Sequence, residues 1–103
     1  MTTVTITEIV DDLRAADEIT RRFERRYWLS SADFYKLYSR GAVDDGEHTE
    51  DFALWAAYYE IKLDREQDLK QLSEERLEAL QAQFRSGEVE IRPPEPALEV
   101  NPS

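Results

Sequence analysis

The sequence predicts an all-α protein: a small helical domain with two N-terminal helices, one long C-terminal helix and an extended C-terminal tail. Three observations favour this class. Apolar residues recur mostly every three or four positions within residues 9–27, 34–38 and 52–84, which is the period of a helix buried on one face. Residues 50–86 contain neither glycine nor proline, and all 4 prolines follow residue 92.

The length and charge of the chain limit what it can do. Its 103 residues suffice for one modest hydrophobic core, so we expect a single helical domain over residues 8–86. Acidic residues outnumber basic residues by 23 to 13, and the net charge of -10 repels phosphate groups. We therefore do not expect the chain to bind nucleic acid on its own.

No segment has the composition of a membrane span or an export signal. The apolar runs are all far shorter than the roughly 18 to 20 residues that a bilayer span needs, and the N-terminus lacks a basic start followed by an apolar stretch. The chain has no cysteine, which excludes disulfides and thiolate metal sites. These features predict a soluble, cytoplasmic protein without membrane contact.

The first helix is predicted over residues 8–28, after an extended arm over residues 1–7 in which threonine alternates with Val4 and Ile6. Thr7 is the predicted N-cap, because Glu8 and the aspartates after it suit the positive end of the helix dipole. The apolar face of this helix carries Ile9, Leu13, Ala16, Ile19, Phe23 and Tyr27.

A short second helix is predicted after the serine pair Ser30 and Ser31. The pair fits a capping box, in which a serine oxygen accepts from a backbone N–H and Asp33 reaches back. Its apolar face carries Phe34, Leu37 and Tyr38. Gly41 stands where a left-handed C-cap is easiest for glycine, and Thr49 is the predicted cap of the next helix.

The third helix is predicted over about residues 50–86. A straight helix of that length would run about 55 Å, whereas a compact domain of this size has a radius of gyration of about 13 Å. The apolar stripe is weakest over residues 65–70, so the chain either bends near residues 64–68 or its last turns project. We expect the compact part to span residues 8–63 and the proline-rich tail, residues 87–103, to be flexible.

The aromatic residues are concentrated in one part of the chain, between Tyr27 and Tyr59. Each buries about 150 to 250 Å² in a core, so this segment supplies much of the drive to fold. Adjacent aromatic residues on a helix diverge by about 100°, so some of them must face solvent or a partner.

One polar loop offers titratable side chains. Its residues are Asp44, Asp45, Glu47, His48, Glu50 and Asp51. Calcium and magnesium prefer oxygen ligands, but the loop lacks the spacing of an EF-hand, and half of its acids suit the start of a helix. His48 has no serine or lysine nucleophile placed beside it. We predict no catalytic, cofactor-binding or metal-binding residues, no cofactor and no enzymatic activity.

The segment RRFERRYW, residues 21–28, places four arginines beside aromatic side chains. Nucleic-acid binders use this combination, but cations also suit the C-terminal end of a helix and can pair with acids of the long helix. We favour the second interpretation. A contact with an acidic partner surface is the next alternative, with a second contact patch made of Arg21, Arg25 and Trp28.

The end of the long helix and the start of the tail carry a strip of apolar residues. The predicted partner-binding residues are Leu69, Leu72, Leu77, Leu80, Phe84, Val89 and Ile91. Such a strip can dock into the groove of a protein partner or pair with a second copy, which would give a homodimer through the long helix. A regular coiled coil is not expected, because no heptad is sustained over three or four repeats.

The pattern E-x-R-Y-x-x-S-S-x-x-F-x-x-x-Y-x-x-G, followed by D-F-x-x-W, resembles short prokaryotic antitoxins of toxin-antitoxin pairs. The matching residues are Glu24, Arg26, Tyr27, Ser30, Ser31, Phe34, Tyr38, Gly41, Asp51, Phe52 and Trp55. The match covers about residues 20–60. It implies a small helical protein that binds and neutralises a cognate toxin, with the C-terminal part as the candidate contact.

The charge of the chain agrees with this expectation, because an acidic protein is steered toward a basic target such as an RNA-cleaving toxin. The alternative is a nucleic-acid-binding transcriptional regulator, since many antitoxins also repress their own operon. In that case the first two helices would imitate a helix-turn-helix, but only Lys36 and Arg40 could read bases. A self-associating helical protein without catalysis is a third interpretation.

Overall fold

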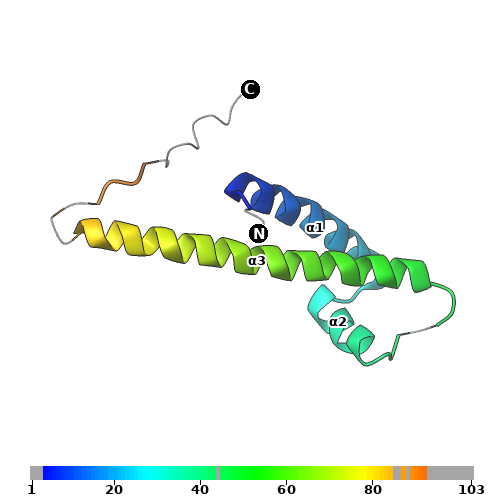
Figure 1. Cartoon of the computed structure of the whole chain (residues 1–103). Coiled ribbons are helices and arrows are strands. Elements are labelled where there is room, and N and C mark those ends of the chain that lie inside the picture. The colour runs from blue at the N-terminus through cyan, green and yellow to red at the C-terminus, as the bar shows by residue number, and fades with distance from the viewer. Residues whose placement is uncertain (1–3, 44, 85–86, 88, 93–103) are drawn as a thin grey trace, which may run out of the picture. The chain divides into compact units, whose positions relative to one another are not determined.

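The computed structural model describes residues 4–43, 45–84, 87 and 89–92. They form three helices: α1 (Ile6–Tyr27), α2 (Ser31–Ser39) and α3 (Thr49–Phe84) (Figure 1). No strand occurs in these ranges, so the predicted all-α class, with two N-terminal helices and one long C-terminal helix, is confirmed. The chain divides into two units, Met1–Lys70 and Gln71–Ser103, which we describe separately.

Helix α1 begins earlier than predicted. Its N-cap is Thr5, whose hydroxyl oxygen accepts from the backbone N–H of Glu8 at 3.1 Å, while Glu8 Oε1 accepts from the backbone N–H of Thr5 at 3.0 Å. This reciprocal capping box needs a glutamate three residues after the cap, which Thr5 has and Thr7 lacks. The prediction of Thr7 as the cap was therefore wrong, and Ile6 and Thr7 belong to the helix and not to an extended arm.

The predicted apolar face of α1 points inward. Ile9, Ala16 and Phe23 are buried, and the other three predicted members of the face are half-buried. Thr20 is also fully buried, and its hydroxyl donates to the backbone carbonyl of Asp17 at 3.1 Å. Threonine can occupy this buried position because its side-chain hydroxyl, a polar group, has a hydrogen-bond acceptor within the helix.

Helix α2 begins with the predicted serine cap, but the return contact of the predicted capping box is not observed among the described residues, where the Asp33 carboxylate pairs with Lys36. Ser30 Oγ accepts from the backbone N–H of Asp33 at 3.1 Å. Phe34 is the buried residue of the predicted apolar face, with 1% of its surface exposed, whereas Leu37 is 39% exposed. The helix ends at a C-cap, Arg40, and Gly41 follows in the left-handed conformation that was predicted for it, at a φ of 71°.

Helix α3 runs without interruption for 36 residues. The break considered near residues 64–68 does not occur, and Thr49 is the first residue of the helix rather than the cap before it. The helix ends at Phe84, and residues 85–86, which were predicted to continue it, lie outside the described residues. Much of the proline-rich tail, residues 93–103, also lies outside them.

The core of the first unit is aromatic. It is built from Phe23, Phe34, Trp55 and Ala56, one or two residues from each helix. The rings of Phe34 and Trp55 stack with centroids 3.8 Å apart and an interplanar angle of 3°. Phe23 stacks on the same indole at 5.6 Å. The concentration of aromatic residues in the middle of the sequence therefore builds the core, as predicted.

Within the first unit, α1 and α3 run antiparallel. Polar pairs link them in reversed order: Asp12 to Arg65 at 2.7 Å, Asp17 to Lys62 at 3.4 Å, and Asp51 to the Tyr27 hydroxyl at 2.7 Å.

The second unit contains the last turns of α3 and a short segment without regular secondary structure. No residue described between 71 and 92 is fully buried. Arg76 of α3 donates from Nη2 to the backbone carbonyl of Arg92, which links residues 89–92 to the helix. Within the described residues, none of the three helices combines the length and hydrophobicity that a bilayer-spanning segment needs.

Candidate partner-binding site

The C-terminal stretch of α3 carries its large apolar residues on one side. We call this set, together with Val89 and Ile91, the C-terminal apolar face; its helical members are Leu72, Leu77, Leu80 and Phe84. At about 100° per residue, these four positions fall within an arc of about 140°. Leu69, the remaining residue of the predicted strip, belongs to the first unit and is half-buried.

Several members of the C-terminal apolar face are open to solvent. Leu77 is 52% exposed, Phe84 is 67% exposed and Ile91 is 79% exposed. Leu72, Leu80 and Val89 are half-buried. An exposed phenylalanine and leucine one heptad apart on a helix resemble the anchors by which a helix docks into a groove. The role of these residues in partner binding stays a prediction.

The charges around this face are mostly negative. Glu74, Glu75 and Glu78 lie on exposed positions of the same stretch of α3. The two described arginines of this unit are engaged internally: Arg76 donates to a backbone carbonyl, and Arg92 forms an ion pair with Glu90 at 2.7 Å. The accessible charge beside the apolar residues is therefore acidic.

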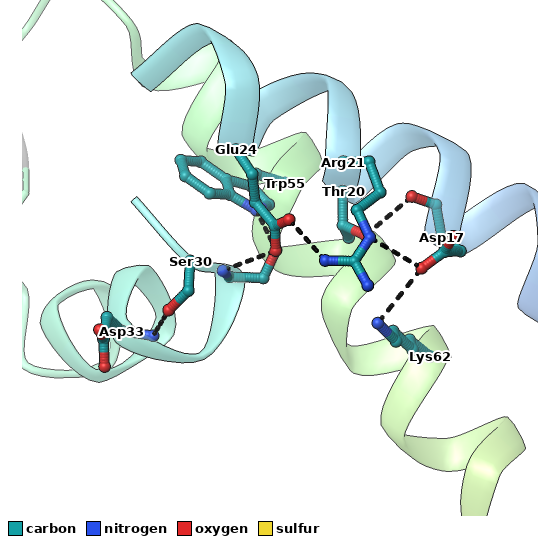
Figure 2. Close-up of polar contacts among 9 residues, drawn as sticks. Asp17, Thr20, Arg21, Glu24, Ser30, Asp33, Trp55 and Lys62 are labelled. Carbon is teal, nitrogen blue, oxygen red and sulfur yellow. Dashed lines mark hydrogen bonds and ion pairs between the residues drawn. The ribbon is translucent and has the colours of Figure 1, made fainter. Parts of the chain in front are cut away.

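A buried polar contact joins the three helices in the first unit (Figure 2). Ser31 Oγ accepts from the indole N–H of Trp55 at 2.8 Å and donates to Glu24 Oε2 at 2.8 Å. The backbone N–H of Ser31 donates to the same carboxylate oxygen at 2.9 Å, and Arg21 donates to its other oxygen at 2.9 Å. Burial raises the pKa of Glu24, but these hydrogen bonds outweigh it and the pKa is lowered overall. The carboxylate is therefore held in its charged form.

The sequence did not reveal this role of the second serine. The pair Ser30 and Ser31 predicted a helix cap, which Ser30 provides, whereas Ser31 is 3% exposed and faces the core. The only available signal was the pair itself, because one serine is enough for a cap.

A second polar contact lies between the end of α1 and the start of α3. The hydroxyl of Tyr27 donates to Asp51 Oδ2 at 2.7 Å, and Arg26 forms an ion pair with the same oxygen at 3.2 Å. Burial and the hydrogen bond to Asp51 raise the pKa of Tyr27. The predicted pairing of the arginine cluster with acids of the long helix is thus observed at Arg26.

The predicted second contact patch is partly engaged within α1. Arg21 pairs with Asp17 at 3.3 Å and with Glu24 at 2.9 Å, so it supports the helix (Figure 2). Arg25 is exposed, and Trp28 is 92% exposed at the C-cap of α1. The patch therefore retains one arginine and the indole as accessible groups.

The acidic loop is organised around its histidine. Asp45 Oδ1 accepts from the backbone N–H groups of Glu47 and His48, both at 2.9 Å, and Asp45 Oδ2 lies 2.7 Å from His48 Nδ1. The hydrogen bond that the His48 ring donates to the Asp45 carboxylate raises the pKa of His48, and the same contact holds the pKa of Asp45 well below its usual range. In the described part of the chain, no three potential ligand side chains converge on a metal position; Asp44 lies outside it.

Helix α2 has few groups that could read bases. Lys36 pairs with Asp33 at 3.6 Å, and Phe34 on the same helix is buried in the core. Arg40 is exposed at the C-cap. This composition offers little to a nucleic-acid-binding regulator.

No family model, curated protein or solved structure matches this chain. The resemblance to antitoxins therefore depends on the quoted residues between Glu24 and Trp55. Most of them have structural roles here, as caps, core residues or partners in the polar contacts described above.

Proposed function

We propose that this protein is an antitoxin-like interaction protein that binds and neutralises a basic cognate toxin through the C-terminal apolar face. It acts by binding and not by catalysis. The observation that carries the proposal is the exposure of Leu77 and Phe84 on one side of α3, in a unit without a fully buried described residue. Large apolar residues gathered on one exposed side mark interaction surfaces more often than scattered single residues do.

The chemistry of the surface indicates the kind of partner. The apolar side chains, with Glu74 and Glu75 beyond the two edges of their arc, fit an apolar groove with a basic rim. A net charge of -10 would speed the encounter with such a partner at low ionic strength. The division of the chain agrees with this role, because the aromatic core lies in the other unit and does not require the partner.

Co-expression with the product of the neighbouring gene tests the proposal. We expect that product to inhibit growth when made without this chain, and to co-purify with the chain when both are made. The double variant Leu77→Lys/Phe84→Lys should weaken the complex by about 100-fold or more, since each buried apolar side chain contributes about 1.5 to 3 kcal/mol. It should also fail to restore growth.

A matched control separates the apolar face from general charge effects. Gln71→Lys/Ala82→Lys places lysines at exposed positions on the opposite side of α3 and should retain binding. Equal loss in both variants would argue against the C-terminal apolar face. A neighbour that is neither toxic nor bound would contradict the antitoxin function, and a concentration-dependent dimer lost only in Leu77→Lys/Phe84→Lys would favour self-association instead.

A further inference from the structure

Trp28 occupies an unusual position at the end of α1. Its side chain is 92% exposed, and its backbone is left-handed, with a φ of 59° and a ψ of 44°. Among the described residues it is the only one other than glycine with a positive φ. Glycine adopts this conformation at helix ends with little steric penalty, whereas a bulky residue does so at a cost. Neither the backbone nor burial in the core explains a tryptophan here.

The backbone on both sides of Trp28 is held firmly. Its N–H donates to the carbonyl of Glu24 at 2.8 Å. Leu29 packs against the aromatic core, and Ser30 caps α2. The indole is therefore presented to solvent from a fixed part of the fold, which lowers the entropy lost when a partner covers it.

Two arginines in the last two turns of α1, which precede Trp28, are available for a partner. Arg21 is held by Asp17 and Glu24, and Arg26 by Asp51. By contrast, Arg22 and Arg25 are exposed and form no ion pair within the described ranges. Arg22 and Arg25 are neighbours on the surface of α1 at i, i+3 spacing, and Trp28, the C-cap, follows three residues after Arg25.

We propose that Arg22, Arg25 and Trp28 form a docking site for an acidic segment of a protein partner. Carboxylates of that segment would pair with the two guanidinium groups, and an apolar or aromatic side chain would cover the indole. Tryptophan and arginine are the residue types most enriched among the energetic anchors of protein interfaces. Arginine–carboxylate pairs also gain strength when an aromatic contact excludes water from them.

The charge distribution favours a short acidic peptide over a nucleic acid. Two available arginines match a segment with two or three carboxylates, whereas a polyanion requires an extended basic track. Glu18 is exposed on the preceding turn of α1, and the chain as a whole carries a charge of -10. Both features repel a long phosphate backbone more than a short peptide.

This site is independent of the proposed toxin-binding function. It lies within Met1–Lys70, whereas the C-terminal apolar face lies within Gln71–Ser103. The two surfaces also have opposite charge preferences. Loss of binding at one of them therefore does not predict the result at the other.

Fluorescence anisotropy of a labelled peptide tests the proposal on the full chain. The probe is a synthetic nonapeptide with three glutamates, one central phenylalanine, and leucine and proline at the remaining positions. We expect saturable 1:1 binding that weakens as salt is raised. Trp28→Ala and Arg22→Glu/Arg25→Glu should each weaken it at least 10-fold, with unchanged far-ultraviolet circular dichroism.

The control is Arg14→Glu/Arg40→Glu, which makes the same change in net charge at two other exposed arginines and should bind the peptide within about 3-fold of the unmodified chain. Equal weakening in both double variants would overturn the site, as would failure of the peptide to bind at millimolar concentration. A labelled oligothymidylate that binds in a Trp28-dependent manner when the peptide does not would assign the patch to nucleic acid and overturn the proposal.

Discussion

At the scale of single residues, Ser31 connects all three helices through one hydroxyl group. That hydroxyl accepts from Trp55 of α3 and donates to Glu24 of α1, at 2.8 Å in both cases. The indole of Trp55 is completely buried, so its N–H has no access to water. A buried donor that loses its acceptor costs more free energy than the hydrogen bond itself contributes.

Replacement of Ser31 by alanine should therefore destabilise the protein by about 1 to 3 kcal/mol, because the Trp55 N–H is left without its acceptor. Urea unfolding followed by circular dichroism measures the change. Ser73→Ala, at an exposed position of α3, is the control and should stay within about 0.5 kcal/mol of the unmodified chain. Equal stability of the two variants would show that the contact contributes nothing.

The contact between His48 and Asp45 makes a prediction about titration. Because the hydrogen bond to the Asp45 carboxylate raises the pKa of His48, we expect this histidine to titrate above its ordinary value of 6.5 in the folded protein. The contact between protonated His48 and Asp45 also stabilises the folded protein. This contribution is fully present below pH 6.5, the unfolded-state pKa, and is lost as the pH rises through the higher folded-state pKa. Nuclear magnetic resonance of the imidazole protons measures the pKa, and Asp45→Asn should lower it toward 6.5. A pKa at or below 6.5 in the unmodified chain would refute the contact.

The apolar residues of the core could be predicted from the sequence, whereas its polar residues could not. Phe23, Phe34 and Trp55 follow from helical spacing and aromatic concentration. The inward positions of Thr20 and Ser31 do not follow, because a buried hydroxyl is acceptable only when a partner is present. For Ser31 that partner lies on another helix, so its role depends on the tertiary structure.

At the scale of helices, the polar stretch of α3 shows why a break was predicted and is absent. The apolar stripe is weakest over residues 65–70, but the side chain of Arg65 in this stretch pairs with Asp12 of α1 and with Asp68 of α3, both at 2.7 Å. A stretch that is polar in sequence can thus still pack against another helix through ion pairs. Without glycine or proline, nothing in the backbone ends the helix there.

The junction between α1 and α2 makes a second prediction about stability. Trp28→Gly should stabilise the protein by about 0.5 to 1 kcal/mol, because glycine avoids a left-handed strain of about 1 to 2 kcal/mol and loses about 0.5 to 1 kcal/mol in backbone entropy. Trp28→Ala keeps a β-carbon in the same conformation and should give no such gain. Thermal and urea unfolding compare the two variants. If Trp28→Gly is less stable than Trp28→Ala, the indole supports the fold.

The helix ends could be predicted where the cap depends only on nearby residues. Ser30 and Gly41 behave as predicted, because a serine cap and a left-handed glycine need only nearby backbone. The predicted start of α1 is two residues too late, because the alternation of residues 2–7 favours a strand and conceals the capping box of Thr5 and Glu8. A capping box with both hydrogen bonds is stronger evidence for a helix start than strand-like alternation over only six residues is for a strand.

At the scale of the whole molecule, the aromatic core and the proposed toxin-binding surface lie in different units. The aromatic core lies in Met1–Lys70, whereas the described part of Gln71–Ser103 has no fully buried residue. The all-α class and the concentration of aromatic residues could be predicted from the sequence. The sequence could not show that Arg21 forms ion pairs while Arg25 forms none among the described residues, because this difference depends on which acidic side chains lie within reach.

Amide hydrogen exchange on the full, unbound chain tests this separation most directly. We expect the strongest protection in α1, α2 and α3 up to about Lys70, and much faster exchange over residues 71–84, where α3 has no fully buried side chain. Equal protection from Trp55 through Phe84 would contradict the account, because the C-terminal turns of α3 would then belong to the same cooperative core.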